Sequence, residues 1–196
     1  LCSMRVDGGA SPIKKTLLYK ERDENLRREF QEKIQFIAKD RLVFLDESGI
    51  DSFVSRHFGR AYRGEKIQGE VSGKRYARKS FIAAKVGSAI IAPMIFEGTC
   101  NSELFETWIE KVLVQELTPG KVIIMDNATF HKSTKAKKLI EQAGCELLFL
   151  PPYSPDLNPI EKFWAYLKKR IREVIANFRT LEQAIVFAFK TVPFLI

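Results

Sequence analysis

Three carboxylate residues stand at positions where a side chain can take part in chemistry. Asp46 and Asp126 each directly follow a short apolar run, and Glu161 closely follows a segment with four prolines in nine residues. Hard divalent cations such as Mg²⁺ bind oxygen ligands, usually one or two protein carboxylates each, with water and substrate phosphate filling the other positions. Two ions about 3.5–4 Å apart stabilise both the attacking and the leaving oxygen of a phosphoryl displacement. The three residues therefore suit the cutting or joining of nucleic-acid strands.

The two aspartates are predicted to sit at the ends of buried strands. The apolar run from Leu42 to Leu45 stops at Asp46, and the stretch from Lys121 to Asp126 repeats this pattern. Aspartates at strand ends often only cap a following turn, and spacing alone leaves that alternative open.

Glu161 is predicted to lie in the first turn of a helix. In "NPIE", Asn158 is expected to cap the helix, with Pro159 at the first helical position and Glu161 at the third. A glutamate there can close a capping box, which is a purely structural role. The helix dipole also favours a negative charge in the first turn, and the preceding prolines restrict the backbone. An ionised, rigidly held glutamate suits a metal ligand, so both roles stay open.

The elements around these residues alternate in type along the chain. Strands in a meander, followed by strands that alternate with helices, predict an α/β sheet with mixed strand directions. Helices are expected at Asp23–Asp40, Asn101–Leu117 and Ser133–Gln142, from Pro159 onward, and from Thr180 to before Pro193; further strands are expected at Ser80–Val86, Ala89–Phe96 and Glu146–Leu150.

The charge of the chain favours a polyanionic partner. Lys and Arg outnumber Asp and Glu by 32 to 24, and the sequence pI is about 9.4. Nine basic and two acidic residues lie between Arg56 and Lys85, around a glycine-bearing stretch that is typical of an exposed loop. Phosphate contact is one interpretation of this loop, and a merely solvated loop is the other. We predict DNA contacts for Arg63, Lys66, Lys74, Arg75, Arg78, Lys79, Lys132, Lys168 and Arg172.

Several neighbours of the three carboxylates also have expected roles. Asn127 and His131 follow Asp126 closely and are candidates for supporting the active site, although His131 is also expected as a polar residue near a helix start. Strand alternation places Glu47 on the face opposite Asp46. Asp156 is expected to form a turn by bonding its own backbone. Trp164 shares a helical face with apolar residues and is expected in the core.

Three sequence blocks together resemble a known family. In order, "FLDESG", "IIMDNATFH" and "LPPYSPDLNPIEKFW" are similar to the signature blocks of DDE transposases of the mariner superfamily, most closely its bacterial insertion-sequence branch. The resemblance covers nearly all of the chain from Asp46 to Arg172. It implies a ribonuclease-H-like fold, a mixed sheet flanked by helices, with catalytic residues at Asp46, Asp126 and Glu161.

The resemblance also implies cofactors and partners. It implies two Mg²⁺ ions on those three residues, with Mn²⁺ as a substitute, and duplex DNA as the substrate. It further implies cleavage at transposon ends and strand transfer into a target, typically the dinucleotide TA, and it suggests a homodimer. With no apolar run long enough for a membrane span and no leader segment, we expect a cytoplasmic, nucleoid-associated protein without a membrane partner.

The expected organisation is a remnant linker at residues 1–20 and a catalytic domain at residues 21–196. Members of the resembled family usually carry helix-turn-helix domains ahead of the catalytic domain, and we expect these to be absent here. An alternative function is a catalytically silent, transposase-derived DNA-binding or regulatory protein. Retention of all three carboxylates favours the enzyme.

Overall fold

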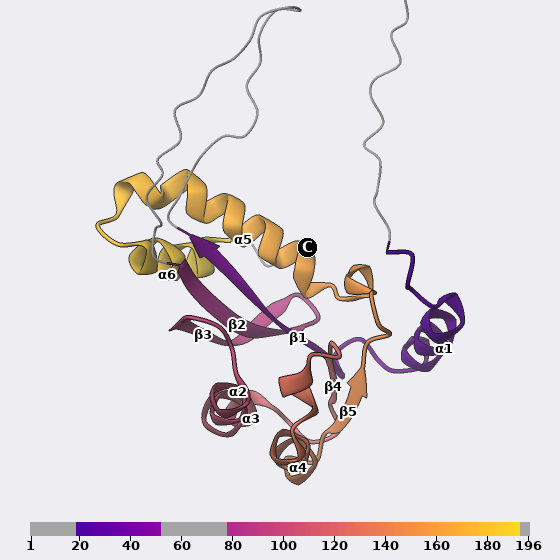
Figure 1. The fold of residues 1–196 in the computed structure, drawn as a ribbon. Coiled ribbons are helices and arrows are strands. Elements are labelled where there is room, and N and C mark those ends of the chain that lie inside the picture. Colours follow the sequence, from indigo (N-terminus) through magenta and orange to yellow (C-terminus); the bar gives the residue numbers. More distant parts are fainter. Residues whose placement is uncertain (1–18, 52–77, 193–196) are drawn as a thin grey trace, which may run out of the picture.

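A five-stranded mixed sheet forms the centre of the protein (Figure 1). The computed structural model describes residues 19–51 and 78–192. The strand order is β3-β2-β1-β4-β5, with β2 antiparallel to both of its neighbours, β1 and β3, and with β4 parallel to β1 and β5 parallel to β4. The strands are β1 (Leu42–Asp51), β2 (Arg78–Val86), β3 (Ala89–Glu97), β4 (Val122–Met125) and β5 (Glu146–Phe149). The predicted α/β sheet with mixed directions is therefore confirmed.

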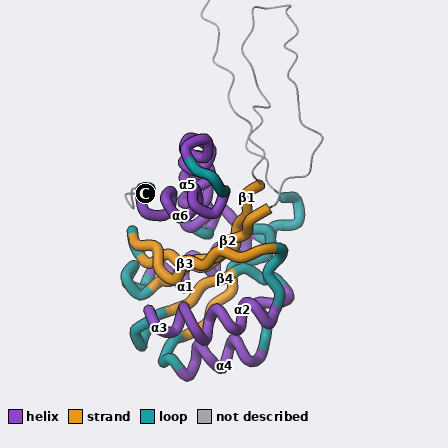
Figure 2. The backbone as a smooth tube through the Cα atoms, turned by 90° about the vertical axis from the view of Figure 1, so that its left-hand side faces the viewer, coloured by secondary structure: helices purple, strands orange, loops and turns teal. Residues whose placement is uncertain are grey.

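Helices cover both faces of this sheet. Figure 2 shows α2, α3 and α4 on one side and α5 and α6 on the other, and α1 lies beyond the β5 edge (Figure 1). A π-helical turn at Ile109–Leu113 joins α2 to α3, and short 3₁₀ turns lie at Thr129–Lys132, Pro155–Leu157 and Ile175–Asn177. The helices are α1 (Glu24–Gln35), α2 (Ser102–Trp108), α3 (Val114–Glu116), α4 (Thr134–Gln142), α5 (Ile160–Val174) and α6 (Leu181–Thr191).

Side-chain caps fix where four of these helices begin. The Asp23 carboxylate accepts hydrogen bonds from the first turn of α1, and the Asn101 side chain accepts one from the Leu104 N–H at 2.9 Å. Ser133 and Thr180 cap α4 and α6 in the same way. Each cap satisfies an N–H group that has no partner inside its helix, which is why polar residues in the sequence indicate these starts correctly.

Strand β1 is longer than the sequence indicates. The apolar run stops at Asp46, but the strand continues to Asp51 because its second half pairs with β2, from Asp46 opposite Ala83 to Asp51 opposite Arg78. Asp46 therefore lies in the middle of a strand, not at its end. Backbone pairing, which the side-chain pattern does not reveal, sustains the strand through its polar residues.

Two apolar clusters pack against the two faces of the sheet. Alternate β1 residues point to opposite sides, so Val43 and Leu45 join the cluster under α2 and α4, whereas Ile50 joins the cluster under α5 and α6. Trp164 belongs to the second cluster and is 1% exposed, which confirms its predicted place in the core. Packing of this cluster between α5 and the sheet holds the helix in place.

Helix α1 is attached through an ion pair that the sequence does not indicate. Asp156 bonds its own backbone, as expected, and its two carboxylate oxygens also accept hydrogen bonds from the Arg27 guanidinium at 2.9 and 2.6 Å. This bond lowers the pKa of Asp156. The pair joins α1 to the proline-rich segment that leads to α5.

Some expectations fall outside the described residues. These include the contacts assigned to Arg63, Lys66, Lys74 and Arg75, and most of the 1–20 linker. Within the part of the chain that the structure describes, no helix is both long and apolar enough to span a membrane.

The burial of α5 generates a stability prediction. Leu167 is completely buried against the sheet, so Leu167→Ala is expected to lower the free energy of unfolding by about 2–5 kcal/mol through reduced burial and the cavity left behind. Chemical denaturation followed by circular dichroism measures this. Lys169→Ala, on the exposed side of the same helix, is the matched control. Equal effects of the two substitutions would contradict the placement of α5.

Candidate active site

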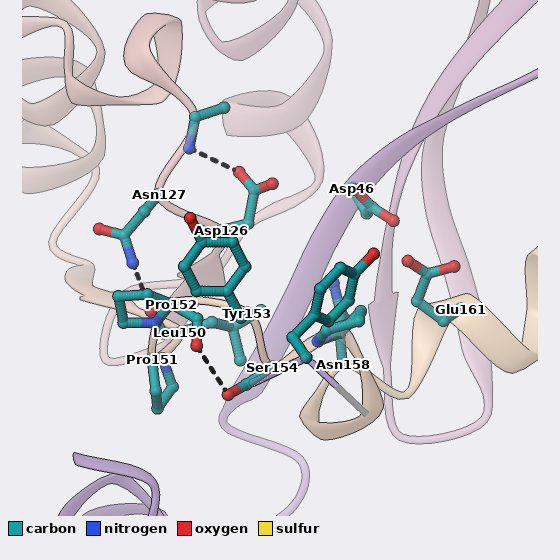
Figure 3. Close-up of a pocket in the computed structure, with 13 residues that line it drawn as sticks. Asp46, Asp126, Asn127, Leu150, Pro151, Pro152, Tyr153, Ser154, Asn158 and Glu161 are labelled. Carbon is teal, nitrogen blue, oxygen red and sulfur yellow. Dashed lines mark hydrogen bonds between the residues drawn. The ribbon is translucent and has the colours of Figure 1, made fainter. Parts of the chain in front are cut away.

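The three carboxylates predicted from the sequence line one pocket. Asp46 comes from β1, Asp126 directly follows β4, and Glu161 lies in the first turn of α5. The pocket has a volume of about 390 Å³, and the segment from Leu150 to Pro155 forms much of its wall. In Figure 3, Asp46 and Glu161 point toward one another and Asp126 lies across the pocket from them.

The register of the sheet brings the two aspartates together. Strands β1 and β4 are parallel neighbours, with Phe44 opposite Ile124. Two residues farther along each chain stand Asp46 and Asp126, and side chains two residues apart in a strand share a face. Parallel pairing therefore brings both carboxylates to the same part of the sheet.

Asp46 has an unusual ionisation. Burial raises its pKa to about 8, and the negative charges of Glu161, Glu47 and Asp126 add to the effect. One of its oxygens, Oδ2, accepts a hydrogen bond from the Trp164 indole N–H at 3.2 Å. This bond and a hydrogen bond from the Glu47 backbone fix the orientation of the carboxyl group.

Asp126 is oriented by two donors on a single oxygen. Its Oδ1 accepts hydrogen bonds from the Ala128 backbone N–H at 2.9 Å and from Nδ1 of His131 at 2.6 Å. The bond from His131 is the main reason that the pKa of Asp126 lies below its usual value. Oδ2 is left for another partner, so Asp126 is an ionised carboxylate with one oxygen free among the described residues.

His131 connects Asp126 to Glu47 inside the protein. It is completely buried, its Nε2 lies 2.9 Å from Oε1 of Glu47, and its ring centroid lies 4.5 and 4.3 Å from those of Phe105 and Phe130. Burial lowers the pKa of His131, but the hydrogen bonds to Asp126 and Glu47 outweigh burial and raise it to about 9. The imidazolium can donate to both carboxylates.

Glu47 has a role in the site that the sequence analysis does not assign to it. Strand alternation does place it on the face opposite Asp46, as predicted, because Asp46 contacts Trp164 of α5 while Glu47 contacts His131 near α4. Its position there completes the support of Asp126. The sequence did contain a signal for this role, because Glu47 directly follows the first aspartate and His131 closely follows the second.

Glu161 does not form the capping box that the sequence allowed. The Asn158 N–H, which a capping box would direct to Glu161, donates to the Pro155 carbonyl at 2.9 Å. The carboxylate of Glu161 has no hydrogen bond to another described residue. Partial burial raises the pKa of Glu161, against the opposing charge of Lys168. Glu161 therefore presents both oxygens to the pocket.

Asn158 and Asn127 hold the proline-rich segment in place. The buried Asn158 amide donates to the Leu45 carbonyl at 3.4 Å, and its oxygen accepts from the Ile160 N–H at 3.4 Å. The Asn127 amide donates to the Leu150 carbonyl at 2.5 Å. Each asparagine thus ties the segment to the residue next to one of the aspartates. The proline-rich segment, held in this way, sets the position of Glu161 relative to Asp46 and Asp126.

The predicted basic residues within the described ranges divide into two groups. Lys168 lies near Glu161, and burial together with the charges of Arg172 and Arg78 lowers its pKa; Lys132 is exposed on the turn after Asp126. Lys79 differs, because its ammonium bonds Glu97 at 2.6 Å and Glu182 at 3.4 Å. Its charge is already compensated, so we omit Lys79 from the proposed phosphate contacts.

The donor set suits a hard cation. Carboxylate oxygens without protein partners face the pocket, and the raised pKa of Asp46 shows that a positive ion there would relieve repulsion. Among the residues described, no group of three or more histidine, cysteine, aspartate or glutamate side chains is close enough to bind one ion together. The arrangement fits pairs of carboxylates better than a single ion held by all three.

Comparisons with known proteins identify the family of the chain. A family model described as "DDE superfamily endonuclease" matches residues 41–185. Tc3 transposase of Caenorhabditis elegans is 39% identical over 147 residues, which are 72% of this chain and 40% of that protein. Tc1 transposase of the same organism is 27% identical over 202 residues, or 94% of this chain and 72% of that protein.

Solved structures share the fold. The Mos1 strand transfer complex has a TM-score of 0.65 at 16% identity, covering 93% of this chain and 64% of that one. The mariner Mos1 paired end complex with Mg has a TM-score of 0.62 at 17% identity, with the same coverage. The predicted ribonuclease-H-like fold is confirmed. The chain spans less than two thirds of the length of Tc3 transposase and of these Mos1 chains.

The contacts of His131 generate a pH prediction. A histidine whose folded pKa is raised from 6.5 to about 9 adds stability that is fully present below about pH 6.5 and disappears as the pH rises through about 9. The chain has two histidines, so a His57→Gln protein gives one imidazole signal in NMR. In metal-free buffer we expect its midpoint near pH 9. A midpoint near 6.5 would show that the two bonds to carboxylates do not form.

Proposed function

Because the chain belongs to the DDE superfamily endonucleases, we propose that it is the catalytic region of a transposase, which cleaves DNA at transposon ends and joins the freed strands to a target. The observation that carries this proposal is the set of three carboxylates, from three separate elements, that line one pocket. That arrangement serves no evident structural purpose, since Glu161 does not cap its helix.

The proposed cofactors are two Mg²⁺ ions, with Mn²⁺ as a substitute. We propose that Asp46, Asp126 and Glu161 would together hold these ions. When bound, such ions stabilise the attacking and leaving oxygens of a phosphoryl transfer. The similar Mos1 complex with Mg supports a divalent cation in this fold.

The remaining residues position the reacting groups. His131 and the Ala128 N–H hold one oxygen of Asp126, and the Trp164 indole holds one oxygen of Asp46, so that the free oxygens keep fixed directions. Lys168 and Arg172 extend from the same side of α5 as Glu161 and are proposed to bind backbone phosphates of the substrate. A positioned phosphate reduces the entropy cost of reaching the reactive geometry.

The proposed partner is duplex DNA, at the transposon ends and at a target that is typically TA. Support comes from the transposases that the chain resembles and from the transposon-end complexes among the similar structures. A homodimer is proposed on the same basis. The alternative, a silent transposase-derived DNA-binding protein, is weakened by the complete carboxylate set and its supporting hydrogen bonds.

The first functional prediction concerns the carboxylates. Asp46→Asn, Asp126→Asn and Glu161→Gln are each expected to reduce Mg²⁺-dependent nicking of duplex DNA by at least about 10²-fold, the decrease usual when a group that stabilises transition-state charge is removed. Each change removes a negative charge with little change in volume. Nicking is measured on supercoiled DNA with Mg²⁺ and with Ca²⁺.

The matched control for this experiment is Glu173→Gln, which removes a glutamate from the far end of the same helix. It is expected to cut DNA at the wild-type rate. If the Glu161→Gln protein also cuts at that rate, the assignment of Glu161 as a metal ligand is wrong.

The second functional prediction concerns phosphate binding. Replacing Lys168 and Arg172 together by glutamine should weaken DNA binding about equally for all sequences and lower the slope of log affinity against log salt by about 0.9 for each phosphate that is no longer neutralised. Lys162→Gln with Lys169→Gln removes the same charge from another side of α5 and serves as the control. An unchanged slope in the first variant would show that these cations face solvent only.

A further inference from the structure

Two exposed tyrosines stand at the rim of the carboxylate pocket. Tyr153 is 53% exposed and Tyr19 is 57% exposed, and both line the same pocket as Asp46, Asp126 and Glu161. Their ring centroids are 5.6 Å apart and the rings are tilted by 40°. Neither hydroxyl has a hydrogen-bond partner among the described residues. The two rings thus contribute little to the core and leave aromatic surface facing the site.

The backbone at Tyr153 is strained. Its φ is +54°, a left-handed conformation that is uncommon for a bulky L-residue. Tyr153 lies between Pro152 and Ser154, and the Ser154 hydroxyl donates to the Pro152 carbonyl at 3.1 Å. The segment around it is further held through Asn127 and Asn158. The surrounding contacts therefore impose a conformation in which this ring borders the pocket.

Exposed aromatic rings beside a phosphoryl-transfer site suit one kind of ligand. Nucleobases stack on aromatic side chains, and this interaction tolerates any base because every base has an aromatic face. Within an intact duplex the faces of a base are covered by its neighbours, so a ring can stack only on a base that has left the duplex or lies at a strand end. Within one nucleotide the base is linked through its sugar to a phosphate, so a stacked base keeps its own phosphate nearby.

We propose that Tyr153 and Tyr19 form a stacking platform for one unpaired nucleobase, whose attached phosphate lies at the three carboxylates. This inference rests on the proposed function and adds a binding site to it. The platform would hold the nucleotide at the cut end after the strands separate. It would act on any sequence, because stacking reads the face of the base and not its edge.

The test compares DNA ends that differ by one base. Binding is measured in Ca²⁺, at fixed salt, to a blunt duplex, to the same duplex with one unpaired terminal nucleotide, and to that duplex with an abasic unit in place of the nucleotide. Wild type is expected to bind the unpaired nucleotide roughly 5- to 100-fold more tightly than the blunt end, the range for stacking one base. The abasic unit, which keeps the phosphate, should remove this gain.

Variants at position 153 distinguish stacking from a structural role. Tyr153→Phe should keep the tighter binding of the unpaired nucleotide. Tyr153→Asn should abolish it, because asparagine tolerates a positive φ but offers no ring. The asparagine variant should also melt at or above the wild-type temperature, since strain is relieved. A lower melting temperature with an unchanged gain would assign Tyr153 to the scaffold and overturn the proposal.

Failure of the platform and failure of the proposed function give different results. If wild type binds and nicks DNA but shows no preference for the unpaired base, or if the abasic unit keeps the preference, the platform is wrong and the proposed function stands. If wild type neither binds nor nicks any of these duplexes, the proposed function fails and the platform fails with it.

Discussion

Asp46 shares its pocket with two other carboxylates, and burial together with their charges raises its pKa to about 8. Bringing like charges together in a partly buried place lowers stability unless a cation or a proton compensates them. The topology nevertheless brings the carboxylates together, because β1 and β4 are adjacent and parallel and α5 lies across the face that Asp46 occupies. The two apolar clusters and the proline-rich segment keep these three elements in place.

Each carboxylate is held in a different way, and among the described residues Asp126 and Glu161 each keep at least one oxygen without a hydrogen bond. The Trp164 indole holds Asp46, the His131 imidazolium holds Asp126, and the backbone of the proline-rich segment places Glu161. His131 is itself held by Glu47 and by two aromatic rings. Fixed supports of this kind keep ligands in one geometry, which limits the reorganisation required when a metal or phosphate binds.

Much of this arrangement was predictable from the sequence. The three acids, the succession of strands along the chain and the caps of α1, α2, α4 and α6 all follow from apolar runs and local capping residues, which act over a few positions in the chain. The cap of α5 was wrong, because this helix begins after Pro159 and not after Asn158. The contacts that were missed are long-range. The extension of β1 depends on pairing with β2, and the Arg27–Asp156 pair joins residues far apart in the sequence. Local patterns carry no information on such partners.

Local patterns did not reveal the polar contacts around Glu161 and Trp164. Glu161 matched a capping box, but the Asn158 N–H that the box needs is taken by Pro155. Trp164 was expected in the core and is there, yet its indole N–H also reaches Asp46. The polar edge of a buried aromatic residue requires a partner, and the sequence alone does not show which one is within reach.

The central claim is that the three carboxylates together would hold two divalent ions. Counting bound Mn²⁺ by electron paramagnetic resonance, on the protein with duplex DNA, tests this most directly. Wild type and Glu173→Gln should bind two ions, and Asp46→Asn, Asp126→Asn and Glu161→Gln should each bind fewer. Equal Mn²⁺ binding by wild type and all three carboxylate variants would contradict the claim.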